Sequence, residues 1–385
     1  MVWALTLFLV LPFAEPPQTT GTRPSFSELA RQADEARSAD KLPDAIRLYR
    51  EAVRQRPGWS EGWWWLGSIY YEQDRFPEAQ ESFRHFVATS PDATAAYAFL
   101  GLCEYETRHF DAARRYFSQW ALKGSPGDDR LIEVAFFHWA LLLTQEGRFP
   151  QALFLLQKAA EQHGPNPLLI EAMGLAWLQM RHIPEDYPPE QREMVWLAGS
   201  AAVFASRSDF ARTQEYAARL VAHYGDRSNV HYFRGMMYSF NSQLEEAEAE
   251  FRKELDVTPA HASAMIQLAL AQYFSSSQLS EARDFAQKAT ALEPKNPLGH
   301  YALGTILLAQ GEAQQSAQEL ELAAELAPAD AKVHLQLGRA YKKLGRTKDF
   351  EHEMAVFTAM KDKQNVFATP EEKLQGLPKN MEQVK

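Results

Sequence analysis

Apolar and small residues recur at helical spacing along most of the chain, with polar residues between them. The clearest stretch is residues 63–91, which read WWWLGSIYYEQDRFPEAQESFRHFVATSP. Leu66 and Tyr70 fall on one face of a first helix, and Phe83 belongs to a second apolar set after a short polar break. Pro91 closes the stretch because proline cannot continue a helix. The pattern predicts two amphipathic helices joined by a short turn.

The same two-helix pattern is repeated almost to the C-terminus. Each copy has a small residue where its helices would have to touch: Ala33, Gly67, Gly101, Ala140, Gly174, Ala201, Gly235, Ala269, Gly304 and Gly338. Subtracting neighbouring numbers gives steps of 34, 34, 39, 34, 27, 34, 34, 35 and 34. Stacked units share one continuous core and contact only their neighbours. The 385 residues therefore form an array, although length alone would suggest about two or three separate domains.

A W-L-G-Y first helix followed by an A-F-A-P second helix, repeated every 34 residues, is the signature of a known family. In the second unit the matching positions are Trp63, Leu66, Gly67, Tyr70, Ala79, Phe83 and Pro91. Over roughly residues 26–364 the chain resembles tetratricopeptide-repeat (TPR) proteins. The resemblance implies an all-α fold, a right-handed α-solenoid of tandem helix pairs with about nine full repeats plus one irregular unit.

Departures from the pattern divide the array. Residues 26–181 are predicted to form an N-terminal array and residues 191–364 a C-terminal array. Between them, residues 182–190 read HIPEDYPPE, and three prolines forbid a regular helix there. This Pro-rich loop either covers an exposed core edge of an irregular unit or serves as a hinge or docking loop between two half-arrays.

The two ends of the chain differ from the array in composition. Residues 1–14, MVWALTLFLVLPFA, carry no charged side chain and are too short to span a bilayer as a helix. They fit the apolar core of a secretory signal, although no Lys or Arg precedes them. This predicts a bacterial protein exported to the periplasm or secreted, with a cytoplasmic protein as the alternative. Residues 15–25 are predicted to be a flexible linker and residues 365–385 a polar tail.

Charge and motifs exclude several classes of function. The net charge of −10 argues against nucleic acid as the main partner, because phosphate binding needs clustered Lys and Arg. No G-x-x-x-x-G-K-[ST], G-x-G-x-x-G or G-x-S-x-G motif occurs in the sequence. His231, His300 and His334 recur at the fourth position of their units, so they lie too far apart to share a metal ion. We expect no catalytic residue, no cofactor, no metal and no integral membrane span.

The resemblance also implies where partners would bind. In this family the second, fifth, ninth and twelfth positions of each unit line the inner face of the solenoid, and here many of these positions are apolar or aromatic. The candidate partner-binding residues are Trp64, Tyr71, Tyr105, Phe137, Leu141, Tyr232, Tyr273 and Tyr301. Exposed Trp and Tyr side chains are typical of interaction sites, whereas a tightly curved solenoid would bury the same rings in its core.

Three functions remain open at this point, one of them a regulatory subunit carried on a separate enzyme. The first is a non-catalytic scaffold that binds protein or peptide segments through an aromatic and apolar concave groove. The alternative is a structural or assembly subunit of a cell-envelope complex, with contacts at the ends of the array or at the Pro-rich loop.

Overall fold

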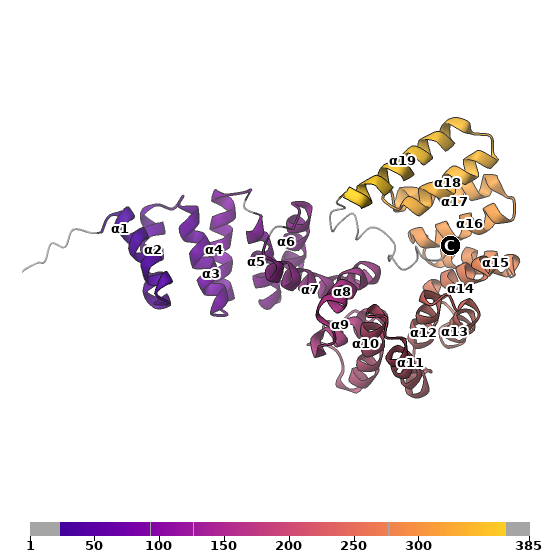
Figure 1. Ribbon diagram of the computed structural model, residues 1–385, viewed down its shortest axis with the longest axis horizontal. Helices are drawn as coiled ribbons and strands as arrows, with labels where there is room; N and C mark the ends of the chain where they lie inside the picture. The colour runs from indigo at the N-terminus through magenta and orange to yellow at the C-terminus, as the bar shows by residue number, and fades with distance from the viewer. Residues whose placement is uncertain (1–23, 93, 126, 276–277, 367–385) are drawn as a thin grey trace, which may run out of the picture. The chain divides into compact units, whose positions relative to one another are not determined.

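The computed structural model describes residues 24–92, 94–125, 127–275 and 278–366 (Figure 1). The predicted signal peptide (residues 1–14), most of the predicted linker (15–25) and most of the predicted tail (365–385) lie outside these residues. The regular structure in the described ranges is helical throughout. None of the helices described is both long and apolar enough to cross a lipid bilayer.

The described residues form nineteen α-helices and one short 3-10 helix. The first ten α-helices are α1 (Phe26–Ser38), α2 (Leu42–Gln55), α3 (Ser60–Glu72), α4 (Phe76–Thr89), α5 (Ala95–Glu106), α6 (Phe110–Leu122), α7 (Asp129–Glu146), α8 (Phe149–His163), α9 (Pro167–Trp177) and α10 (Arg192–Ser206). The remaining elements are η1 (Pro189–Gln191), α11 (Phe210–Tyr224), α12 (Val230–Phe240), α13 (Leu244–Val257), α14 (Ala262–Phe274), α15 (Leu279–Leu292), α16 (Pro297–Ala309), α17 (Ala313–Leu326), α18 (Ala331–Lys343) and α19 (Thr347–Val366).

Consecutive helices pack as pairs. Nine such pairs are present in the described part of the chain: α1 with α2, α3 with α4, α5 with α6, α7 with α8, α10 with α11, α12 with α13, α14 with α15, α16 with α17, and α18 with α19. Helix α9 is left without a second helix of its own. The prediction of an all-α array of nine full repeats plus one irregular unit is confirmed.

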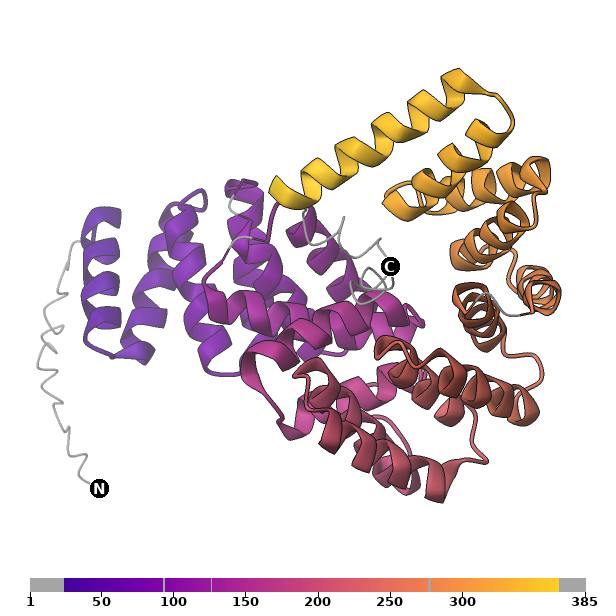
Figure 2. The same cartoon turned by 45° about the vertical axis from the view of Figure 1, so that its right-hand side comes forward.

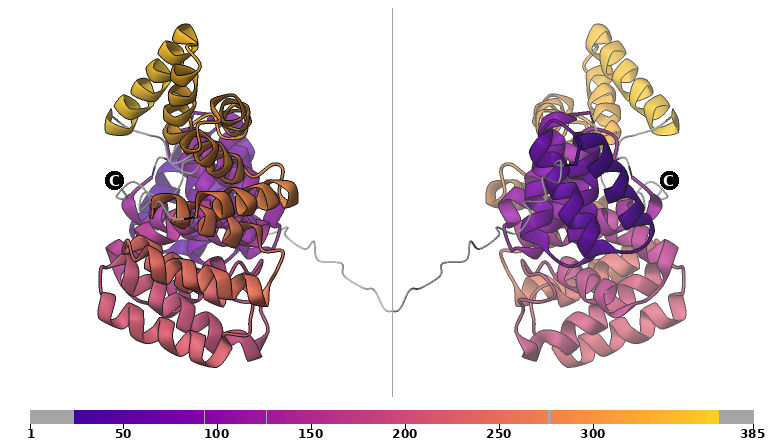
Figure 3. Two further views of the ribbon diagram at one scale, coloured as in Figure 1. Left: turned by 90° about the vertical axis from the view of Figure 1, so that its right-hand side faces the viewer. Right: turned by 90° about the vertical axis from the view of Figure 1, so that its left-hand side faces the viewer.

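The chain divides into two compact units, one ending at Pro91 and the other beginning at Asp92. In the first unit, α1 to α4 lie side by side in Figure 1, and the right-hand view of Figure 3 shows the indigo first pair in front. The second unit contains α5 to α19, and Figure 2 shows its later pairs, from α12 to α19, stacked one on the next.

Small residues let the two helices of a pair approach each other closely. A Cβ atom added to Gly67 would lie 2.7 Å from the ring of Phe83. The same contact recurs one period later between Gly101 and Phe117, at 2.6 Å. These distances are shorter than a real Cβ contact, so the aromatic ring of the second helix occupies the space that a side chain on the first helix would need. The periodic small residues in the sequence therefore mark the crossing point of each pair.

The irregular unit replaces its missing second helix with α10. A Cβ atom added to Gly174 would lie 2.0 Å from the carbonyl oxygen of Val195, and one added to Gly199 would lie 1.8 Å from the carbonyl oxygen of Ile170. Helices α9 and α10 therefore touch backbone to backbone. Because α10 also pairs with α11, it takes part in two helix pairs.

The Pro-rich loop packs against its own chain. Ile183 and Tyr187 are buried within it. The hydroxyl of Tyr105 on α5 donates a 3.5 Å hydrogen bond to Glu185 of the loop, and Arg108 just after α5 forms an ion pair with Asp186. The loop thus covers side chains of α5, which lies 80 residues earlier in the sequence.

Candidate functional site

The eight predicted partner-binding residues belong to both compact units. Trp64 and Tyr71 lie on α3 in the first unit. The other six lie in the second unit, on α5 (Tyr105), α7 (Phe137 and Leu141), α12 (Tyr232), α14 (Tyr273) and α16 (Tyr301).

These residues differ in how much surface they offer. Leu141, Tyr105 and Tyr301 are buried, with exposed fractions of 3%, 7% and 9%. The remaining five are half-buried. A partner would therefore find only part of the predicted apolar surface accessible in this structure.

The half-buried rings pack partly against their own chain. The Trp64 ring centroid lies 5.7 Å from that of Phe83 and 5.2 Å from that of Phe86. Tyr71 makes an edge contact with Phe76 at the start of α4, with the ring centroids 5.8 Å apart. Such contacts restrict the orientation of each ring.

Tyr232 lies beside a buried carboxylate. Its ring stacks on His261 at 5.0 Å, and burial raises the pKa of its hydroxyl. Glu254 is fully buried and accepts hydrogen bonds from the backbone N–H groups of Asn229 at 2.8 Å and Tyr232 at 3.1 Å. The Glu254 carboxylate thereby satisfies N–H groups at the start of α12 that no helical carbonyl can reach.

The ring of His261 is held at both nitrogens. Its Nδ1 accepts a hydrogen bond from the backbone N–H of Ala264, so its Nε2 carries the proton and faces the side-chain oxygen of Asn229 at 2.8 Å. Burial lowers the pKa of His261. His138 on α7 is comparable, because burial lowers its pKa as well.

The recurring histidines are explained by the repeat. His231, His300 and His334 each place Nδ1 within 2.5 to 2.7 Å of a glutamate 19 residues later, and these partners are Glu250, Glu319 and Glu353. In the last two units, Nε2 also faces a proline carbonyl six residues earlier, at 3.0 Å. Trp63 donates its indole N–H to the Pro57 carbonyl at the same spacing. In these units the side chain at the fourth position of the repeat therefore links the first helix to the turn before it by a hydrogen bond.

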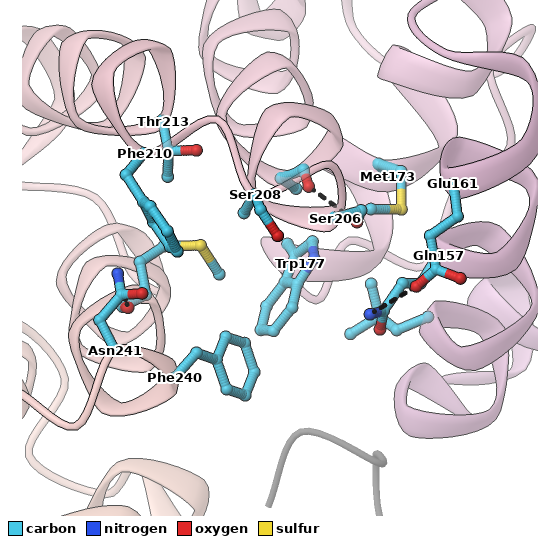
Figure 4. A pocket seen from close by; sticks show the side chains of 14 residues that line it. Gln157, Glu161, Met173, Trp177, Ser206, Ser208, Phe210, Thr213, Phe240 and Asn241 are labelled. Carbon is cyan, nitrogen blue, oxygen red and sulfur yellow. Dashed lines mark hydrogen bonds between the residues drawn. The ribbon is translucent and has the colours of Figure 1, made fainter. Parts of the chain in front are cut away.

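A hollow of about 250 Å³ opens in the second unit where α9 lacks its second helix. Helices α8, α9, α10, α11 and α12 all contribute to its walls (Figure 4). Its lining residues are Leu153, Gln157, Glu161, Met173, Trp177, Ala202, Ala205, Ser206, Ser208, Phe210, Thr213, Met237, Phe240 and Asn241. We call it the α9 hollow. Sequence reasoning did not predict it, although the unpaired first helix was its signal.

The α9 hollow stays open partly because one aromatic pair is missing. In two other units a tyrosine at the end of the first helix packs on a phenylalanine five residues later: Tyr71 on Phe76, and Tyr105 on Phe110. The equivalent residues here are Ala205 and Phe210. Without a tyrosine beside it, Phe210 remains 54% exposed.

The chemistry of the hollow favours binding over catalysis. Two of its three hydroxyl groups hydrogen-bond to their own backbone: Ser206 donates to the Ala202 carbonyl, and Thr213 to the Asp209 carbonyl. Neither hydroxyl is paired with a base that could activate it. Elsewhere in the described ranges, no cluster of three or more His, Cys, Asp or Glu side chains is arranged to hold a metal ion.

Comparisons with known proteins point to one family. A model described as "Tetratricopeptide repeat" matches residues 31–79 and 69–129. Anaphase-promoting complex subunit 3 of Schizosaccharomyces pombe is 27% identical over 124 residues, which cover 32% of this chain and 18% of that protein. The chain thus matches less than a fifth of the length of this relative.

Solved structures of two other proteins are similar to this chain at low TM-scores. A crystal structure of MamA is 17% identical, with a TM-score of 0.39 over 43% of this chain and 97% of the other. Yeast Tom70 is 13% identical, with a TM-score of 0.36 over 88% of this chain and 84% of the other. The helix pairs repeating at 34-residue steps and the matching family model together place this chain in the tetratricopeptide-repeat family.

Proposed function

We propose that this chain is a non-catalytic scaffold that binds segments of partner proteins through aromatic side chains on its first helices. TPR proteins generally mediate protein–protein interactions and are typically non-catalytic. The observation that carries the proposal is the recurrence of half-buried aromatic residues at inner-face positions, in both compact units. Trp64 and Tyr71 represent them in the first unit, and Tyr232 and Tyr273 in the second.

The half-buried state suits a binding role. A ring already fixed by neighbours, as Trp64 is by Phe83 and Phe86, loses little side-chain entropy when a partner covers it. Trp and Tyr are also enriched among the residues that contribute most to binding energy.

A crosslinked affinity capture from the native host tests the proposal. Wild type is compared with a Trp64→Ala/Tyr71→Ala variant, and a Leu292→Ala/Leu326→Ala variant serves as the matched control. The two leucines are 48% and 40% exposed and lie on second helices. We expect partners to be lost with the first variant and kept with the control, while circular dichroism shows unchanged helix content. Equal capture by all three proteins would contradict the proposed surface.

We also propose that the protein is exported from a bacterial cell. The proposal rests on the uncharged apolar run of residues 1–14. Fractionation of the native host followed by mass spectrometry of the N-terminal peptide tests it. Protein found in the cytosol with Met1 intact would show that the chain acts inside the cell.

A further inference from the structure

We propose that the α9 hollow binds one large apolar side chain of a partner segment that carries a Lys or Arg close to that side chain. This inference rests on the proposed scaffold function and names a second site for it, lined by none of the predicted inner-face residues, together with the chemistry of the segment that binds there.

One core position at the floor of the hollow lacks its usual cover. Met173 and Trp177 on α9 are equivalent by repeat to Leu66 and Tyr70 on α3, which are 1% and 5% exposed. Met173 is as buried as Leu66, so the difference lies at Trp177. In α3 the following helix α4 covers this face, whereas α9 has no second helix of its own. Trp177 is therefore only half-buried and forms part of the wall of the hollow.

Trp177 is held in place from one side. Its ring makes edge contacts with Phe233 and Phe240 of α12, each at a centroid distance of 5.7 Å. Figure 4 shows it between Phe240 and Met173, in the middle of the lining side chains. Its indole N–H has no acceptor among the described residues, so it can donate to a carbonyl of a bound segment. A fixed aromatic wall with a free donor is typical of a side-chain pocket.

The size of the hollow limits what can fill it. Clefts that bind small molecules usually measure about 300–1,000 Å³. The α9 hollow measures about 250 Å³, below that range. Its apolar wall of Met173, Trp177, Phe210 and Phe240 is suited to one large aliphatic or aromatic side chain.

The charge around the hollow favours a Lys or Arg next to the bound apolar side chain of the partner. Glu161 lines it and accepts a 3.3 Å hydrogen bond from Gln157. Glu246 lines an adjoining hollow that shares Phe210 and Asn241, and it accepts a 3.2 Å hydrogen bond from Gln243. Neither carboxylate forms an ion pair within the described ranges.

Both hollows are lined by described residues, and none of these lining residues is basic. The nearby Arg207 donates to the backbone carbonyls of Ala160 and Glu161 at 3.3 and 3.5 Å. It therefore stabilises the end of α8 and does not form an ion pair with the Glu161 carboxylate, which accepts a hydrogen bond from the neutral Gln157. Two carboxylates without an ion pair among the described residues, one lining each hollow, attract a cation and repel an acidic segment.

The matched variants come from the structure itself. Ala205→Tyr should fill the hollow without disturbing the fold, because it recreates on Phe210 the tyrosine–phenylalanine pair found between Tyr71 and Phe76. Glu161→Lys/Glu246→Lys reverses the local charge. Leu322→Ala removes a leucine that is 43% exposed on α17 and serves as the control.

The experiment selects binders from a displayed library of random short peptides on the full-length wild-type protein. Synthetic copies of the selected peptides are then titrated against each variant by fluorescence anisotropy. We expect enrichment of peptides with one large apolar residue beside Lys or Arg. Ala205→Tyr should weaken their binding about ten-fold or more, and the charge reversal should also weaken it, while Leu322→Ala leaves it unchanged.

The possible failures are distinguishable. Selected peptides that bind Ala205→Tyr as tightly as wild type, but lose affinity with Trp64→Ala/Tyr71→Ala, would overturn this inference and support the proposed function. If no peptide is enriched on the wild type, both proposals are contradicted. A wild-type dimer that Ala205→Tyr converts to a monomer, measured by light scattering, would show that a second copy of the chain fills the hollow instead of a partner peptide.

Discussion

Replacing Gly199 with alanine should weaken the contact between α9 and α10. The added Cβ would lie 1.8 Å from the Ile170 carbonyl oxygen, and real Cβ contacts essentially never fall below 3.0 Å. The difference, 3.0 minus 1.8, means that the two helices must separate by about 1.2 Å. A backbone carbonyl cannot rotate away as a flexible side chain would, so the strain has to be taken up by the helices themselves.

The size of the effect follows from two opposing contributions. Overpacking a tight contact typically costs about 1–3 kcal/mol, and a contact with backbone belongs at the upper end of that range. Alanine returns up to about 1 kcal/mol through its higher helix propensity. We therefore expect Gly199→Ala to lower the local free energy of unfolding by about 2 kcal/mol.

Hydrogen exchange followed by mass spectrometry is the suitable assay, because a repeat array need not unfold in one step. A loss of about 2 kcal/mol corresponds to roughly 30-fold faster exchange through local opening. The faster exchange should be confined to peptides from α8 to α11, which are the neighbours of the altered contact.

Gly338 provides the matched control within the same fold. A Cβ added there would meet Met354 at 3.4 Å and Glu353 at 3.5 Å, which are ordinary van der Waals distances. Gly338→Ala should therefore slow exchange in α18, by up to about 1 kcal/mol of added stability. Unchanged protection of α9 and α10 in Gly199→Ala, or the same effect from both alanines, would show that the backbone contact is not strained by the added methyl group.

Three further predictions concern buried charges and the Pro-rich loop. Burial lowers the pKa values of His138 and His261 from 6.5, so both favour the neutral ring in the folded state. Their contribution to the stability of the fold is fully present above pH about 6.5 and is lost as the pH falls through their lower folded-state pKa values. The urea midpoint of unfolding should therefore drop on acidification, and it should drop less in His261→Asn. Glu254→Ala leaves two backbone N–H groups at the start of α12 without their acceptor, which should cost about 2–4 kcal/mol by urea denaturation; an unchanged midpoint would show that water replaces the carboxylate. Arg108→Ala removes the ion pair with the loop, whose partners are 56% and 40% exposed, so overall stability should change by less than about 1 kcal/mol. Exchange in the loop should nevertheless be faster, and a loop with unchanged protection would show that Ile183 and Tyr187 alone hold it.

The periodic part of the fold is predictable from the sequence because each contact is local. The small residue of a first helix and the side chain that it meets on the second helix lie 16 residues apart, as Gly67 and Phe83 or Gly304 and Leu320 do, so the period alone identifies the pair. The same reasoning located α9 and the loop after it. Nine pairs and one irregular unit could therefore be expected before the structure was known.

The irregular region could not be predicted in the same way. The series of small residues passes through Ala201, whereas the backbone contact with α9 is made by Gly199. Nothing in the 34-residue period specifies this contact, because α10 meets a helix outside its own unit. The contact between Tyr105 and the Pro-rich loop could not be predicted either, since the loop lies 80 residues away in the sequence. A hollow left by an absent helix has no sequence motif of its own.

The double role of α10 has a consequence for how the second unit responds to force or heat. In a linear array each repeat is linked to the next by one interface, and the array opens first where that interface is weakest. The sequence break after α9 would suggest such a weak point. Because α10 is the partner of both α9 and α11, neither neighbour can leave without disrupting it. The break in sequence periodicity should therefore behave as a cooperative joint, with α9, α10 and α11 unfolding together in a single step.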